Sequence, residues 1–221
     1  MRNRINRRTD NLASVSKDKA LEDEHNTSGI FFMYSFFDKE THNNHKIKID
    51  KVNRWRYETS NELVPENRYM FAVGKNGALY LGNPTVHSQF KAGKQVQSAG
   101  WIEYQWDNEE QQAKILIDNC SGHYTPTLSQ FIQTLYGLHQ AKFLPDHLEI
   151  RLSKFTLFDY ENMSPFWNEI IKEAKLETTE VLSLTYSEQD DGFVFMRSSG
   201  ETAKMDKKDI FPEKTDLRME A

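Results

Sequence analysis

The sequence predicts an α+β domain: an antiparallel sheet that contains a meander, with two main helices packed on it. Residues 69–118 hold short apolar segments separated by turn-forming residues, which is typical of β-strands. Thr127 begins an amphipathic helix, and Ser164-Pro165 begins a second, because proline is tolerated in the first turn of a helix. A chain of 221 residues with 38% hydrophobic content can enclose one core of this kind.

The first half of the chain is expected to hold a polar arm followed by strands. Residues 1–28 are polar and predict a disordered arm whose four arginines form a solvated tail. The apolar run 30–37 predicts a buried strand, and partial alternation predicts another within 46–58. Asn76-Gly77 lies between two apolar runs and predicts a hairpin, because both residues tolerate positive φ; its strands are 69–74 and 78–82.

The second half predicts further strands around the two helices. Thr127 and Gln130 form a T-x-x-Q capping box, and the helix should end near 139–142. The second helix is expected over 166–176. Strands are expected at 95–106, 113–118, 148–152, 181–186 and 193–197. We expect a single domain over residues 29–198 and a mobile charged tail over 199–221.

The charge and the cysteine content exclude several classes of function. A formal charge of −5 argues against a nucleic-acid partner, since phosphate binding needs clustered positive charge. The single cysteine, Cys120, cannot form an intramolecular disulfide. No apolar run reaches the ~18 residues that a membrane-spanning helix needs. No apolar segment follows the N-terminal arginines, so we expect a cytoplasmic protein, or one exported without a cleaved signal peptide.

Two loops, 83–93 and 120–127, carry the candidate functional residues. The strands 78–82, 95–106 and 113–118 follow one another with short connections, so we expect them to pair as an antiparallel meander. Both loops would then open at the same end of the sheet, within roughly 10 Å of each other. This geometry predicts a shared ligand pocket, and its candidate residues are His87, Ser88, Ser121, Gly122, His123, Tyr124 and Thr127.

The chemistry of these residues leaves several interpretations open. A histidine that positions a hydroxyl, a tyrosine that stacks, and helix amides that hold an anion would suit a nucleotide-like ligand or cofactor. Cys120 with His123 lacks a third, orienting group for a nucleophile. His87 with His123 lacks further ligands, so no metal site is expected. Each histidine can also be a hydrogen-bonded structural residue.

Residues of both loops resemble a known domain. The pattern HSSFxAGxxVxxAGxI…SGHYxP is similar to His87-Ser88-Gln89-Phe90, Ala92-Gly93, Val96, Ala99-Gly100, Ile102 and Ser121-Gly122-His123-Tyr124-Thr125-Pro126. It occurs in plant IQ-motif calmodulin-binding proteins, in fungal relatives and in bacterial effector and polymorphic-toxin modules. Gln89 departs from the second serine of the pattern, and Ile132-Gln133 lacks the basic residues of an IQ motif, so calmodulin binding does not carry over.

The resemblance and the loops lead to three hypotheses about function, and they leave open whether the chain is an enzyme. The first is an effector-like or toxin-like domain with a ligand pocket built from the two loops. The second is a non-enzymatic module that binds a protein partner, with the loops as structural latches, meaning loops held in place by buried hydrogen bonds. The third is an ADP-ribosyltransferase-like enzyme, which would need a carboxylate such as Glu103 at the pocket.

Overall fold

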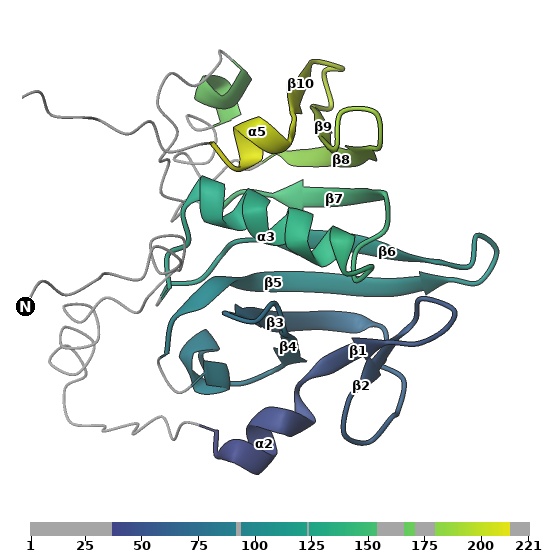
Figure 1. The fold of residues 1–221 in the computed structure, drawn as a ribbon, viewed down its shortest axis with the longest axis vertical. Coiled ribbons are helices and arrows are strands. Elements are labelled where there is room, and N and C mark those ends of the chain that lie inside the picture. Colours follow the sequence, from purple (N-terminus) through teal and green to yellow (C-terminus); the bar gives the residue numbers. More distant parts are fainter. Residues whose placement is uncertain (1–36, 92–93, 123, 154–165, 171–179, 213–221) are drawn as a thin grey trace, which may run out of the picture.

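The computed structural model describes residues 37–91, 94–122, 124–153, 166–170 and 180–212 (Figure 1). They form a mixed α/β domain built on one large, mostly antiparallel sheet. Within these ranges, no helix has both the length and the apolar character that crossing a bilayer would take. The elements are α2 (Lys39–Asn44), β1 (Ile47–Ile49), β2 (Trp55–Tyr57), β3 (Asn67–Gly74), β4 (Leu79–Gly82), the 3-10 helix η1 (His87–Lys91), β5 (Val96–Asp107), β6 (Gln112–Asp118), α3 (Leu128–Gln140), β7 (His147–Arg151), β8 (Val181–Ser187), β9 (Gly192–Met196), β10 (Thr202–Met205) and α5 (Lys207–Ile210).

The large sheet has eight strands in the order β10-β9-β8-β7-β6-β5-β3-β4. All neighbouring strands are antiparallel except β6 and β7, which are parallel and are connected through α3. The β3–β4 hairpin predicted around Asn76-Gly77 is confirmed, with Val73 opposite Leu79. Of the meander expected from 78–82, 95–106 and 113–118, β5 and β6 pair antiparallel as expected, but the pairing of β4 with β5 is wrong, because β3 lies between them. The hairpin places β4 on one side of β3, and β5 pairs with the other side.

The N-terminal strands differ from the expectation in one respect. Residues 46–58 form two short strands rather than one, and β1 and β2 make a separate two-stranded sheet. The Asp50 carboxylate accepts hydrogen bonds from the amides of Val52 and Arg54, and this side-chain turn reverses the chain. The strand expected over 30–37 and the arm 1–28 lie outside the described residues, apart from Phe37.

The main core lies between the large sheet and α3, which covers one face of the sheet and runs roughly along its strands (Figure 1). The predicted capping box is confirmed: the Thr127 side chain accepts from the Gln130 amide, and the Gln130 side chain accepts from the Thr127 amide. The apolar stripe of α3 is buried against β-strand side chains such as Ile102 and Ile117. Of the second predicted helix, residues 166–170 are helical and bury Phe166, Trp167 and Ile170; the rest of 166–176 lies outside the described residues.

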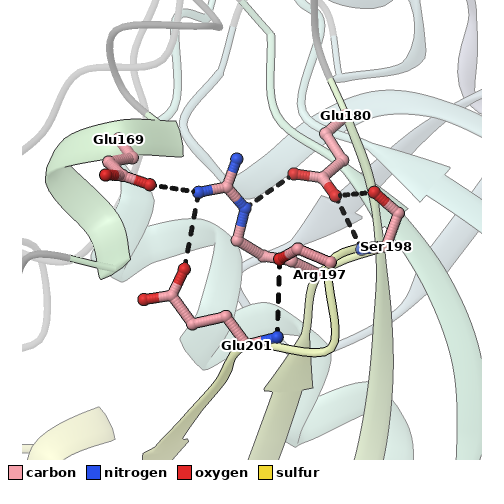
Figure 2. Close-up of polar contacts among 6 residues, drawn as sticks. Glu169, Glu180, Arg197, Ser198 and Glu201 are labelled. Atoms are coloured by element: carbon pink, nitrogen blue, oxygen red, sulfur yellow. Dashed lines mark hydrogen bonds and ion pairs between the residues drawn. The ribbon is translucent and has the colours of Figure 1, made fainter.

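Regular structure continues beyond residue 198, the expected end of the domain. β10 pairs with β9, and α5 follows it with its own capping box at Asp206. Arg197 joins this extension to the rest of the domain, because its guanidinium contacts three glutamates that come from separate segments (Figure 2). These are Glu169 at 2.6 Å, Glu180 at 2.8 Å and Glu201 at 3.6 Å.

A second polar cluster connects α3, the β8–β9 turn and α5. One oxygen of the Asp191 carboxylate accepts hydrogen bonds from the hydroxyls of Tyr136 and Tyr186, at 2.6 and 2.8 Å. The ammonium group of Lys207 donates to the other oxygen at 2.8 Å. These hydrogen bonds, that of Lys207 first, lower the pKa of Asp191 to about 2. The ionised carboxylate therefore stabilises the contact between α5 and the sheet.

Replacing Asp191 with asparagine is expected to make the free energy of unfolding vary less with pH between pH 7 and pH 3. The pKa of Asp191 in the folded protein is below that of an unfolded aspartate, ~3.9. Its contribution is thus complete above pH ~4 and is lost as the pH falls towards about 2. Denaturant unfolding at pH 7, 4 and 3 should show wild type more stable than Asp191→Asn at pH 7, with the difference shrinking at pH 3. A pH-independent difference would contradict this role. Asparagine suits the test because it tolerates the φ of 44° at this position.

Candidate functional site

Half of β5 lacks a strand neighbour on one side, and the two loops lie there. β6 pairs with β5 only from Ile102 to Asp107, whereas β3 pairs with β5 from Val96 to Tyr104. The backbone of β5 between residues 96 and 101 therefore needs other partners on the side facing β6. The carboxylate of Asp118 supplies one, because a single oxygen accepts from the amides of Trp101 and Cys120 at 3.0 and 2.8 Å.

Gly100 allows the chain to cross β5 at this place. A Cβ atom on Gly100 would overlap the carbonyl oxygen of Asp118 and would lie 2.9 Å from the Cα of Asn119. Glycine within a strand often marks such a close approach of another backbone segment. The second loop therefore leaves β6 directly over Gly100, and no larger residue fits this position without a shift of the backbone.

The first loop reaches the same residue through His87. The Nε2 atom of His87 donates to the carbonyl oxygen of Gly100 at 2.8 Å, because a carbonyl can only accept. The imidazole also packs edge-on against the indole of Trp101, with 6.0 Å between ring centroids. The Gln89 side-chain oxygen accepts from the amides of Thr85 and Val86, so this residue fixes the first turn of the loop.

The second loop is held by Tyr124. Its hydroxyl donates to the carbonyl oxygen of Lys94 at 3.1 Å, and its ring is fully buried. The Ser121 hydroxyl accepts from the Tyr124 amide at 3.4 Å. Thr125 has a φ of 38°, a left-handed conformation that is unusual for a β-branched residue. Tyr124 belongs to a second small core, on the sheet face opposite α3, with Ala72, Tyr80, Phe90, Val96 and Ala99.

The two loops thus come together on β5, although by a different topology from the expected meander. Most of the described candidate residues are buried within this packing: His87, Ser88, Ser121 and Tyr124 are between 1% and 7% exposed. Gly122 is exposed, and the Thr127 hydroxyl is used in the helix cap. His123 lies outside the described residues, so its pairing with His87 or Cys120 stays a prediction.

Burial shifts the pKa of two polar groups in this region, Asp118 and Tyr124. Burial raises the pKa of the Asp118 carboxyl above its usual value, and the hydrogen bonds from Cys120 and Trp101 and the charge of Arg68 act in the opposite direction. Burial also raises the pKa of Tyr124 well above that of an exposed phenol, so the hydroxyl stays a donor. Within the described ranges, no group of three or more His, Cys, Asp or Glu side chains is placed to bind a metal ion.

One surface feature was not among the sequence candidates. The guanidinium of Arg68 lies over the indole of the partly exposed Trp101, 4.7 Å from the ring centroid. Arg68 also lies 3.6 Å from a carboxylate oxygen of Glu103 and 3.8 Å from one of Asp118. We call Arg68, Trp101 and Glu103 the Arg68–Trp101 surface. Its sequence signal is weak: Trp101 is out of phase with Ile102, Tyr104 and Trp106, which face the core.

Comparisons with known protein families, with curated proteins and with solved structures find no match for this chain. The resemblance to the HSSF…SGHY domain therefore stays a prediction that these comparisons do not test.

Gly100→Ala is expected to destabilise the fold strongly. The new methyl group overlaps the Asp118 backbone, and relieving that overlap requires a movement of β5 or of the second loop. We expect a loss of about 1–3 kcal/mol in the free energy of unfolding, as for other overpacked sites. The measurement is equilibrium denaturation.

Gly137→Ala is the matched control for this substitution. Gly137 is exposed in α3 and has no atom within 4 Å of the added Cβ. Alanine should therefore raise stability by about 0.5–1 kcal/mol, because it favours the helix over the unfolded chain. Equal effects of the two substitutions would show that Gly100 is not a point of close approach.

Proposed function

We propose that this chain is a non-enzymatic module that binds a protein partner, and that the loops 83–93 and 120–127 are structural latches. The observation that supports this most is the burial of the described candidate side chains, together with their use in internal hydrogen bonds. His87 donates to Gly100, and Tyr124 donates to Lys94, both within one chain. A residue that binds substrate needs access to it, whereas a latch needs a buried partner.

The partner is proposed to bind at the Arg68–Trp101 surface. Tryptophan and arginine are the residues most enriched at the energetically dominant positions of protein interfaces. Here the indole is held between the His87 ring and the Arg68 guanidinium, so it is presented in a fixed orientation. The latches would then serve binding indirectly, by fixing the part of β5 that carries Trp101.

Two other hypotheses are less well supported by these contacts. A ligand pocket at the two loops would require His87 and Tyr124 to leave their present hydrogen bonds. An ADP-ribosyl transfer would require a carboxylate directed at such a pocket, and Glu103 contacts Arg68 instead. The following experiment can also give a result that supports a functional pocket at the two loops.

The experiment separates the latches from the binding surface. His87→Ala should lower the free energy of unfolding by about 1–3 kcal/mol, the cost of an unsatisfied buried hydrogen-bonding group. Arg68→Ala should change stability by less than about 0.5 kcal/mol, because its side chain is half exposed. A protein captured by the wild-type chain from its own cell extract should be lost with Arg68→Ala. It should be kept with Lys204→Ala, a substitution in the edge strand β10, which is far from β3 in the strand order.

The opposite pattern would contradict the proposal. If His87→Ala leaves the unfolding curve unchanged but removes ligand binding or turnover, the loops form a functional pocket. If Arg68→Ala retains the captured protein at the wild-type level, the Arg68–Trp101 surface is not its binding site.

A further inference from the structure

Three lysines surround a hollow beside the first loop. The hollow has a volume of about 580 Å³ and is lined by Lys75, Asn76, Lys91, Lys94 and Gln95. Lys75 and Asn76 lie in the β3–β4 turn, whereas the other three come from the end of η1 and the approach to β5. A volume of this size falls in the range of small-molecule sites, ~300–1,000 Å³. The hollow therefore has room for a small ligand.

The positive charge at this hollow is not neutralised by the described part of the chain. Within the described residues, the lysines that form ion pairs with carboxylates are Lys46, Lys114, Lys204 and Lys207. None of these four lines the hollow. The charged groups that act on Lys91 are Lys94 and Lys46, which are both cations. An anion bound in the hollow would offset the repulsion that Lys94 and Lys46 exert on Lys91.

Lys91 is held in position by neutral groups. Its ammonium donates to the Nε2 atom of His42 at 3.2 Å and lies 4.8 Å from the ring centroid of Tyr80. Its side chain passes Gly74, where a Cβ would lie 3.6 Å from the Lys91 Cε atom. Burial, followed by the charges of Lys94 and Lys46, lowers the pKa of Lys91 below its usual value. These contacts fix the position of the ammonium group without cancelling its charge.

We propose that this hollow, defined by Lys75, Lys91 and Lys94, binds a small ligand that carries phosphate groups. Lysine ammonium groups bind phosphate as point charges, and three of them suit a group with more than one negative charge. The side-chain amides of Asn76 and Gln95 add neutral donors at the same hollow. A concave site of this volume suits a small molecule better than the flat surface of a macromolecule. The inference is independent of the Arg68–Trp101 surface.

The test uses the full chain and inorganic pyrophosphate at low ionic strength. Isothermal titration should show saturable binding that weakens as NaCl is added, because salt screens exposed charges. Backbone amide resonances of Lys75, Asn76, Lys94 and Gln95 should shift during the titration. The double substitution Lys91→Gln with Lys94→Gln should weaken binding by at least about tenfold, since each lost charge-assisted contact contributes roughly that factor.

Control variants and alternative ligands make the outcome decisive. Lys204→Gln removes an exposed lysine on the opposite edge strand and should keep the wild-type affinity within about twofold. Arg68→Ala should also bind pyrophosphate normally, so a failure of this site is distinct from a failure of the proposed protein interaction. Inorganic phosphate and ADP are compared with pyrophosphate. Tighter binding of ADP identifies a nucleotide, and equal affinities show that phosphate groups alone are recognised.

Three results would overturn the proposal. The first is the absence of saturable pyrophosphate binding, and the second is an equal loss of affinity in the Lys204→Gln variant. The third is binding of an oligo-glutamate peptide in place of pyrophosphate, which would make the hollow a contact for an acidic protein segment.

Discussion

The close crossing of two backbone segments at Gly100 is the constraint on which the rest of this region depends. The chain leaving β6 passes over Gly100, and the imidazole of His87 is bonded to the Gly100 carbonyl. The Asp118 carboxylate replaces the missing strand partner of Trp101. Both loops contact β5, and they meet at Gly100. The missing side chain of Gly100 leaves the room that this crossing needs. The second small core around Tyr124 then forms on the face that α3 does not cover.

This constraint separates the residues that hold the region from those that face solvent. The histidine and tyrosine that look chemically active in the sequence lie inside the packing. Accessible groups include Arg68 and Trp101 on the paired strands β3 and β5, and the lysines of the hollow, which lie in the β3–β4 turn, at the end of η1 and before β5. Under the proposal that the loops are latches, a backbone held in place by them would limit the entropy lost on binding. The proposed functions therefore use the exposed side chains of this region and not the buried histidine and tyrosine.

Local features of the fold could be predicted from the sequence because they depend on neighbouring residues. The Asn76-Gly77 hairpin and the Thr127–Gln130 capping box are examples. The strand order could not, because a hairpin offers two edges and the sequence does not say which edge β5 will pair with. Asp50 ended a strand through a side-chain turn that the apolar pattern did not reveal. Lys75 and Lys91 are 16 positions apart, and each alone is typical of a solvated surface lysine.

The convergence of the two loops on β5 is tested most directly by proton nuclear Overhauser effects in the folded chain. The account predicts cross-peaks between the ring protons of His87 and the indole protons of Trp101, and between the ring protons of Tyr124 and the backbone of Lys94. It also predicts a slowly exchanging Tyr124 hydroxyl proton, since that group is buried and donates within the chain. Ring protons of His87 and Tyr124 that show no such cross-peaks, together with rapid hydroxyl exchange, would contradict it.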